Sequence, residues 1–600
     1  MLSVSPSRQP RFQLVLIKPS HYDDDGYVIQ WARAFIPSNS LAVINSIARD
    51  AMRRAVLGPD IDFDMTVIDE ANTRVNIVKI LSDFRRNDGF GLVALVGVQS
   101  NQFPRALDIA RPLRAAGIPV IVGGFHVSGC LAMLSDMQAD MQTALDMGIS
   151  LFAGEVEGRM DGLLKEAATR TLQPIYNYMK DLPSLEGEPT PILPAELVKR
   201  TVQNFASFDA GRGCPYQCSF CTIINVQGRK SRGRTADDVE KTIREHLSAN
   251  IRNFFITDDN FARNKDWESI FDRLIALRER DHLNIKFMIQ VDTLCHKIPD
   301  FIEKAKRAGV NRVFIGLENI NPENLLVAKK RQNKITEYRR MLLAWKKAGV
   351  ITYGGYILGF ANDTPESIRG DIEIIKKELP IDFLEFFVLT PLPGSEDHQI
   401  LWQKHTPMDA DMNRYDSEHV VTAHPKMTRH DWEDIYREAW HAYYTPEHMV
   451  TILRRGAATQ SPISALPGHL MFFANFVPIE NVHPLQGGLW RRKYRRDRRA
   501  GFPIEPMWSF YPKYAWDSIY KYSVFVRSWL KLDAAVRRIR KDPNRLLYTD
   551  QALTEVTEDE TELLELFTHS NDARHAVEHE KKIARLTGGQ SHALEHDKAM

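Results

Sequence analysis

The sequence predicts an α/β fold with two parallel-sheet units in series, followed by a mainly helical region. Within residues 1–170, short apolar runs alternate with helical stretches, and the same alternation recurs within 200–395. Such alternation implies parallel strands joined by right-handed crossovers. After residue 396 the alternation stops, and amphipathic helical stretches continue. A chain of 600 residues is also too long for one hydrophobic core.

The first unit, residues 1–170, is predicted to be a doubly wound, flavodoxin-like sheet of Rossmann type. Its expected strands, rich in Val, Ile and Leu as a sheet covered on both faces requires, are 12–18, 65–69, 92–98, 119–122 and 149–153. Ligands of such sheets lie beyond the carboxyl ends of the strands. The candidate binding residues at those ends are His21, Gly97, Gly123, Gly124, His126, Gly154 and Glu155.

The second unit, residues 200–395, is predicted to be a partial (β/α)6 barrel. Its expected strands are 207–210, 253–257, 285–291, 312–317, 351–357 and 383–389. Chemistry in such barrels gathers at the carboxyl ends of the strands. The candidate residues there are Asp258, Asp259, Gln290, Glu318, Gly355 and Gly359. A single acidic residue after a strand is more often a helix cap, but several in register indicate a site.

Three of the five cysteines lie within eight residues, with the spacing C-x3-C-x2-C: Cys214, Cys218 and Cys221. Three thiolates can bind one face of an iron–sulfur cluster and leave one iron free for a substrate or cofactor. A structural zinc site usually takes four ligands, and no second cysteine pair is present. The alternatives are a chance grouping or a zinc site completed by a distant histidine.

The stretch GRGCPYQCSFC at 211–221 resembles the signature of the radical S-adenosylmethionine (SAM) enzymes. The resemblance implies that the three cysteines hold a [4Fe–4S] cluster whose fourth iron is chelated by SAM. It also implies that the backbone of Phe220 lies near the adenine, with Gly355 and Gly359 close by. In this family Glu318 would bind the ribose, and either Asp258 or Asp259 would bind the methionyl ammonium.

The first unit, placed directly before this core, resembles the cobalamin-binding domain of the B12-dependent radical SAM enzymes. The local matches are Gly-Gly-Phe-His at 123–126 and Gly-Glu-Val-Glu-Gly at 154–158. The D-x-H-x-x-G motif of other B12 proteins is absent, since Gly124 stands where the aspartate would be. We therefore expect cobalamin without a histidine ligand to cobalt. As ligands to cobalt, His21 and His126 are less expected than as ordinary loop residues.

The remaining regions are a linker, an aromatic and basic region, and a charged tail. Residues 171–199 hold five prolines and predict an extended linker. Residues 396–550 are expected to be mainly helical, and seven of the nine residues in 491–499 are Lys or Arg. That run suits a solvated loop, an anionic membrane surface or an acidic partner; nucleic acid is not expected. Residues 551–600 predict a short helix and then disorder.

The resemblance implies an enzyme that cleaves SAM reductively and abstracts a hydrogen atom from an unactivated C–H bond, with cobalamin-dependent C-methylation as the leading outcome. Cyclisation, rearrangement or oxidation without methylation is the alternative, and a non-enzymatic cobalamin or metal sensor is a remote one. The expected partners are a small-molecule or lipid-like substrate and a reductant such as flavodoxin or ferredoxin. The net charge of +1 and the absence of a long apolar run predict a cytoplasmic protein, with peripheral membrane contact as an option.

Overall fold

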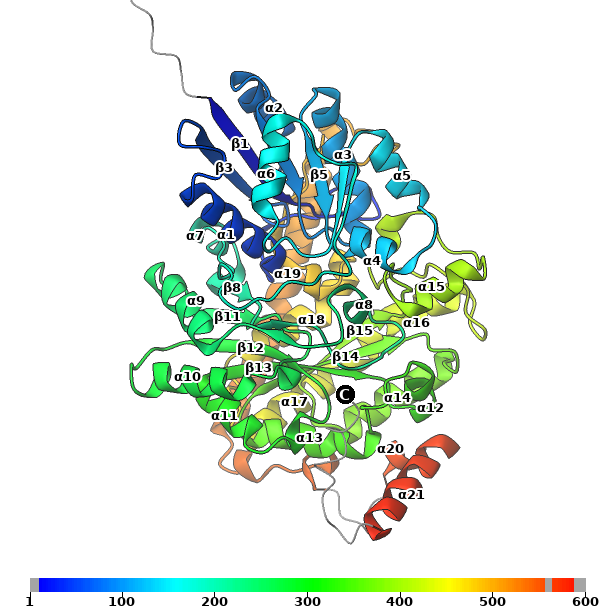
Figure 1. Ribbon diagram of the computed structural model, residues 1–600. Helices are drawn as coiled ribbons and strands as arrows, with labels where there is room; N and C mark the ends of the chain where they lie inside the picture. The colour runs from blue at the N-terminus through cyan, green and yellow to red at the C-terminus, as the bar shows by residue number, and fades with distance from the viewer. Residues whose placement is uncertain (1–9, 556–563, 587–600) are drawn as a thin grey trace, which may run out of the picture.

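The computed structural model describes residues 10–555 and 564–586, and its first unit is a six-stranded parallel sheet covered on both faces (Figure 1). The strands, in pairing order, are β3 (Asp62–Asp69), β1 (Arg11–Lys18), β4 (Gly91–Leu95), β5 (Val120–Gly123), β6 (Ser150–Ala153) and β7 (Ile175–Asn177). The helices are α1 (Asn39–Arg53), α2 (Ile77–Arg86), α3 (Phe103–Ala115), α4 (Phe125–Met133), α5 (Ala139–Asp146) and α6 (Met160–Thr169).

The apolar runs explain this sheet, because adjacent residues of β1 enter different cores. Leu14 and Leu16 join the core that continues into the barrel, whereas Val15 and Ile17 join a second core on the other face. All five predicted strands are present. The sixth strand, β7, was missed because it has three residues, of which one is buried, and lies in the stretch predicted to be an extended linker.

The second unit is an open parallel sheet whose strands pair in chain order, as the sequence predicts. They are β8 (Phe205–Phe208), β11 (Asn253–Ile256), β12 (Lys286–Val291), β13 (Val310–Glu318), β14 (Ile351–Leu358) and β15 (Phe383–Val388). The intervening helices include α9 (Ala236–Ser248), α10 (Trp267–Glu279), α11 (Phe301–Ala308), α13 (Ile335–Lys347) and α14 (Pro365–Glu378). Capping boxes at Thr235 and Thr364 fix where α9 and α14 begin.

The first unit lies against the carboxyl ends of the barrel strands (Figure 1). Its helix α4 contacts the loop after β15 so closely that a Cβ at Gly129 would lie 2.3 Å from the carbonyl oxygen of Pro393. The same helix contacts α8 (Ile223–Val226), which directly follows the cysteine motif. The two units therefore face each other across the region where barrel chemistry is expected.

The C-terminal region is helical, as predicted, and covers one side of both units. Its main helices are α16 (Arg429–Tyr443), α17 (Pro446–Ala458), α18 (Leu466–Glu480) and α19 (Met507–Lys541). One element was not predicted: β16 (Gly488–Arg491) pairs antiparallel with β2 (Trp31–Ala34), and two short strands more than 450 residues apart leave no local pattern. In the described part of the chain, no helix combines the length and hydropathy that a membrane crossing needs.

The basic run at 491–499 is not a free solvated loop. Arg491 and Lys493 pair with Asp23, and Arg499 pairs with Asp411. Acidic partners distant in sequence therefore neutralise part of the run, which the sequence could not show.

The described part of the charged tail is helical, where one short helix is predicted. Its helices α20 (Glu565–Thr568) and α21 (Asn571–Leu586) pack together, and α21 contacts α12 (Pro322–Val327). Glu580 of α21 forms an ion pair with Lys334, which lies after α12. The disorder expected in the rest of the tail concerns 556–563 and 587–600, which lie outside the described residues.

Candidate active site at the domain interface

The three cysteines lie on one loop beyond β8, with Cys218 buried and the other two half-buried. Burial, with a smaller contribution from the neighbouring thiol of Cys218, raises the pKa of Cys214 to about 11 and that of Cys221 to about 12. The amide of Gln332 donates to the sulfur of Cys218 at 3.5 Å. Among the described residues, no three His, Cys, Asp or Glu side chains converge to hold a single metal ion. A donor set of three soft thiols in one loop fits an iron–sulfur cluster.

A largely buried lysine that was not predicted from the sequence lies beside these thiols. Lys330 forms an ion pair with Glu318, and its ammonium lies 5.6 Å from the centre of the Phe220 ring. Burial opposes its charge, but the carboxylate of Glu318 and the thiol of Cys218 outweigh burial and raise the pKa of Lys330. A lone lysine in a loop after a short helix gives no sequence signal, so this residue could be found only in the structure.

Glu318 occupies the end of β13 in a left-handed conformation, with φ of +64°. Residues other than glycine rarely adopt this conformation, and it costs free energy unless the surroundings require it. Here β13 shifts register against β14 at this position. Its carboxylate is thereby held next to Lys330 at the mouth of the barrel, where the sequence analysis placed a SAM ligand.

The two candidate aspartates after β11 have different surroundings. One oxygen of Asp258 accepts backbone N–H bonds from Ala210 and Gly211 at 2.7 and 2.8 Å, and the other accepts from Asn264 at 2.8 Å. Asp258 therefore braces the loop that leads to the cysteines. Within the described residues, no hydrogen bond from another residue to the Asp259 carboxylate is found, and its negative charge contributes to the raised pKa of Cys214 and of Cys221. Of the pair, Asp259 is the carboxylate that is not engaged in supporting the cysteine loop.

The three remaining candidate residues of the barrel differ in what they contact. Gln290 donates its side-chain amide to the backbone oxygen of Asp258 at 3.2 Å, so it supports the β11 loop. Gly355 is confined by aromatic rings, since a Cβ there would lie 3.0 Å from Phe314. At Gly359 a Cβ would lie 1.9 Å from the indole of Trp432, on helix α16. The group that closely approaches Gly359 is therefore a side chain of the C-terminal helices. The sequence predicts that the adenine of SAM lies beside this glycine.

A cavity opens beyond the carboxyl ends of the first sheet and extends between that sheet and helices α1 and α6. The five predicted residues that line it are Gly97, Gly123, Gly124, Gly154 and Glu155. Deeper in, it is lined by apolar side chains such as Leu16, Val43, Ala94 and Leu163. The cavity also reaches the barrel, because Arg212, Val226 and Gln227 form part of its wall.

The two predicted histidines do not line this cavity. Both ring nitrogens of His126 are occupied, at 3.1 Å from the hydroxyl of Ser100 and 2.9 Å from a carboxylate oxygen of Asp140. His21 is buried, and burial lowers its pKa to about 4. Both are framework residues of the first unit, and the expectation that they contact a cofactor finds no support in their positions.

Buried ion pairs join the two units at the mouth of the cavity. Arg212 of the barrel donates to Glu155 and to Glu157 of the first unit, both at 2.7 Å, and to Asp209 at 3.0 Å. Arg232 also pairs with Glu155. Burial raises the pKa of Asp209, but the nearby arginines outweigh it and hold the pKa at about 2. The carboxylate of Glu155 therefore forms ion pairs across the domain interface.

Arg212→Met should lower the free energy of unfolding by about 3–5 kcal/mol, because three buried carboxylates would lose their common cation. Denaturant unfolding of the purified chain measures this. The control Arg54→Met removes a surface cation paired with Asp161 and should cost at most about 1 kcal/mol. The pKa of Asp209 is lowered from 3.8 to about 2 in the folded chain. Its ion pairs therefore stabilise the folded state fully above pH 3.8, and this stabilisation is lost as the pH falls towards about 2. Equal effects of the two variants would contradict the buried network.

Known proteins resemble this chain over part of its length. The model of the radical SAM superfamily matches residues 209–375. Bacteriochlorophyllide d C-12(1)-methyltransferase of Chlorobaculum tepidum is 25% identical over 422 residues, which are 69% of this chain and 84% of that protein. Hopanoid C-2 methylase of Rhodopseudomonas palustris is 26% identical over 294 residues, covering 48% and 53%.

Among solved structures, the radical SAM methyltransferase TsrM of Kitasatospora setae, with cobalamin and a [4Fe–4S] cluster bound, superposes with a TM-score of 0.54. It is 14% identical, and the match covers 73% of this chain and 90% of that one, so the likeness concerns the fold. The cysteine loop and most of the barrel lie within the residues that the superfamily model matches. Residues 209–375 therefore form a radical SAM domain, and the chain is similar in sequence to methyltransferases and in fold to a radical SAM methyltransferase that binds cobalamin.

Proposed function

We propose that this enzyme is a cobalamin-dependent methyltransferase that acts on an unactivated C–H bond of an apolar small molecule. One observation carries the proposal: the cavity of the first sheet is walled partly by barrel residues that flank the cysteine loop on both sides, Arg212 before it and Val226 after it. A ligand in that cavity would therefore lie against the region where SAM is bound and cleaved. The resemblance in fold to TsrM, whose structure holds cobalamin, supports the same assignment.

The lining of the cavity suits a large cofactor with a flat face. Glycines at the strand ends let a macrocycle approach the backbone, and the apolar channel beyond them can take an extended group. When bound, the cluster, SAM and cobalamin supply an adenosyl radical and a transferable methyl group. The protein binds and orients these groups and keeps water from them.

The charges at the barrel mouth match the polar groups of SAM. Asp259 would pair with the ammonium, Lys330 with the carboxylate, and Glu318 with the ribose hydroxyls. In the structure Lys330 and Glu318 form an ion pair with each other. SAM binding would exchange this pair for contacts with the ligand, so both charges remain compensated in each state.

An apolar substrate fits the side chains around the cysteine loop. Phe220 of the motif packs against a small hydrophobic cluster that contains Ala328, Ile357 and Phe360. The named substrates of the relatives, bacteriochlorophyllide d and hopanoid, are large and mainly apolar. We propose a substrate of that character, with electrons supplied by a flavodoxin or ferredoxin.

The reaction type can be tested without the substrate. The cluster is reconstituted anaerobically, and the chain is incubated with SAM and dithionite, with or without hydroxocobalamin. The proposal expects 5′-deoxyadenosine in both samples and S-adenosylhomocysteine only with the corrinoid. Formation of 5′-deoxyadenosine alone in both samples would favour the non-methylating alternative, in which the first unit has another role.

Ala94→Phe tests the cavity itself. Ala94 lies on β4 and faces the channel, so a phenyl ring there would fill part of the space that the cofactor needs. We expect corrinoid retained after desalting to fall at least about tenfold, because a close-packed site does not accommodate the added ring. Ala94→Val, a smaller addition at the same position, should retain most of it. Cluster iron should be unchanged in both, and full retention in Ala94→Phe would place the corrinoid elsewhere.

A further inference from the structure

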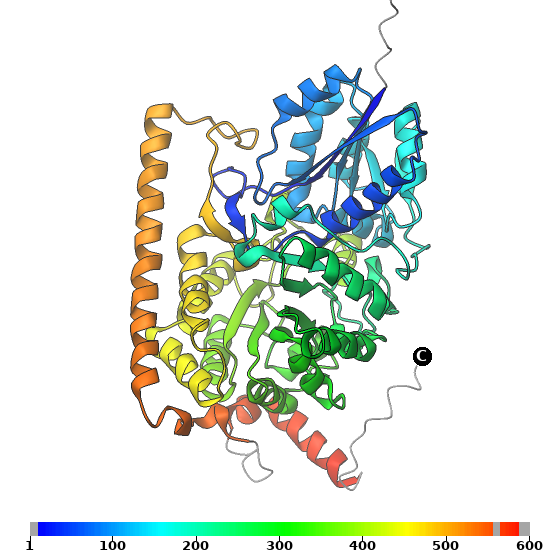
Figure 2. The ribbon, with the colours of Figure 1, turned by 90° about the vertical axis from the view of Figure 1, so that its left-hand side faces the viewer.

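Helix α19 lies along one edge of the molecule with one of its faces uncovered (Figure 2). It has 35 residues and contacts α17 and α18. Its buried side chains are Phe510, Leu532, Ala535, Val536 and Ile539. The opposite face has no covering element in the described part of the chain, and the view in Figure 2 shows the helix at the outer margin of the fold.

The uncovered face is apolar. Trp508 is 81% exposed, Trp516 72% and Ile519 64%, and Val526 and Leu530 are also exposed. The spacing of these five residues places them within one stripe of the helix. Exposed apolar residues scattered singly are ordinary, but a continuous stripe on a long helix marks an interaction surface.

The same helix concentrates positive charge. It contains eight Lys or Arg and two acidic residues, whereas the whole chain has a net charge of +1. Both acids are paired within the helix, Asp517 with Lys521 and Asp533 with Arg537. Arg527 and Lys531 are exposed beside the apolar stripe. The surface therefore offers apolar groups and cations together.

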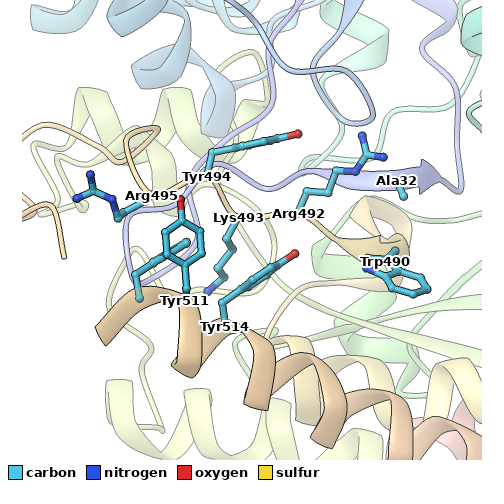
Figure 3. Close-up of a pocket in the computed structure, with 9 residues that line it drawn as sticks. Ala32, Trp490, Arg492, Lys493, Tyr494, Arg495, Tyr511 and Tyr514 are labelled. Carbon is cyan, nitrogen blue, oxygen red and sulfur yellow. The ribbon is translucent and has the colours of Figure 1, made fainter. Parts of the chain in front are cut away.

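A basic pocket lies at the beginning of α19, between the helix and the strand β16 and the loop that follows it (Figure 3). Its cations are Arg492, Arg495 and Lys493, of which Lys493 is paired with Asp23, and Tyr494, Tyr511 and Tyr514 supply aromatic rings. The remaining lining residues are Ala32, Trp490 and Phe510. Guanidinium groups and tyrosine hydroxyls are donors that suit a phosphate.

We propose that the α19 stripe with its flanking cations docks on an anionic lipid bilayer. The apolar stripe would lie in the boundary between headgroups and acyl chains, and Arg527 and Lys531 would bind lipid phosphates. The basic pocket, whose residues Phe510 and Tyr514 lie on the opposite face of α19, is outside this contact and adds positive charge near the beginning of the helix. Tryptophan and tyrosine beside Lys and Arg are typical of such interfaces. A second copy of the chain is the poorer occupant, because an isologous contact would oppose two clusters of the same charge. The inference does not depend on the reaction.

The test is flotation of the reconstituted full-length chain with vesicles of phosphatidylcholine, alone or with about 30% phosphatidylglycerol. Two variants address the surface: Trp508→Ser/Trp516→Ser removes apolar groups, and Arg527→Glu/Lys531→Glu reverses charge on the flank of the stripe. Their matched controls are Val78→Ser/Leu547→Ser, at residues 78% and 77% exposed, and Lys199→Glu/Lys404→Glu, also at exposed positions.

We expect the wild type and both controls to float with the anionic vesicles only, and added salt to reduce binding. Each surface variant should bind at least about tenfold less. Their 5′-deoxyadenosine formation without lipid should equal that of the wild type, which shows that they are folded. The proposal is overturned if the wild type does not float, if surface and control variants behave alike, or if sedimentation shows a dimer that Trp508→Ser/Trp516→Ser dissociates.

Discussion

Cys218→Ala is expected to lose the cluster and, with it, SAM cleavage. A [4Fe–4S] cluster held by three cysteines has no spare ligand, and Cys218 is the buried member that receives a hydrogen bond from Gln332. Iron should fall from about four per chain to near zero after anaerobic reconstitution. Formation of 5′-deoxyadenosine should fall at least about a hundredfold.

Cys295→Ala is the matched control, since Cys295 is also a buried cysteine but lies in the barrel core, outside the motif. It should keep its iron and its SAM cleavage. If Cys218→Ala kept both properties as well, the cluster could not be held by the loop at 214–221.

Changing each of the adjacent aspartates Asp258 and Asp259 to asparagine should impair a different property: stability for Asp258 and SAM binding for Asp259. Asp259→Asn removes the charge that would pair with the SAM ammonium, so the SAM dissociation constant should rise about tenfold or more. Asp258→Asn leaves one of three internal hydrogen-bond donors without an acceptor. Its free energy of unfolding should fall by about 1–3 kcal/mol.

Both variants are compared as cluster-loaded protein, by equilibrium binding of SAM and by denaturant unfolding. Each variant serves as the other's control, because the substitution is the same and the positions are adjacent. Weak SAM binding by Asp258→Asn with normal stability, together with unchanged binding by Asp259→Asn, would reverse the assignment.

The secondary structure and the cluster loop could be predicted from sequence because their signals are local. Apolar runs indicate buried parallel strands, and a three-cysteine motif needs only eight residues. The distinction between Asp258 and Asp259 could not be predicted, since it depends on backbone donors at Ala210 and Gly211, nearly 50 residues earlier. Lys330 gave no signal at all, because its role depends on which buried groups surround it.

Long-range packing also determines the surroundings of several candidate residues. Gly359 was expected beside a ligand, but the neighbour that requires a glycine there is Trp432. His126 follows a strand, as a ligand would, yet its ring bonds to Asp140 of helix α5. The basic run finds acidic partners such as Asp23 near the other end of the chain. Trp432 and Asp23 are far in sequence from the residues that they contact, and Asp140 lies 14 residues after His126 on another helix, so composition and spacing carry no information about these partners.

The most direct test is electron paramagnetic resonance of the chain loaded with both cluster and cobalamin and reduced under anaerobic conditions. If the cavity at the domain interface holds the corrinoid against the cluster loop, the cob(II)alamin signal should be altered by magnetic interaction with the reduced cluster. Ala94→Val, which is expected to retain cobalamin, is the control. When its cluster is left oxidised, the cob(II)alamin signal should be unaltered, because an oxidised cluster has no net electron spin. Retention of cobalamin with a signal that is indifferent to the state of the cluster would contradict a shared site, as would failure to retain cobalamin at all.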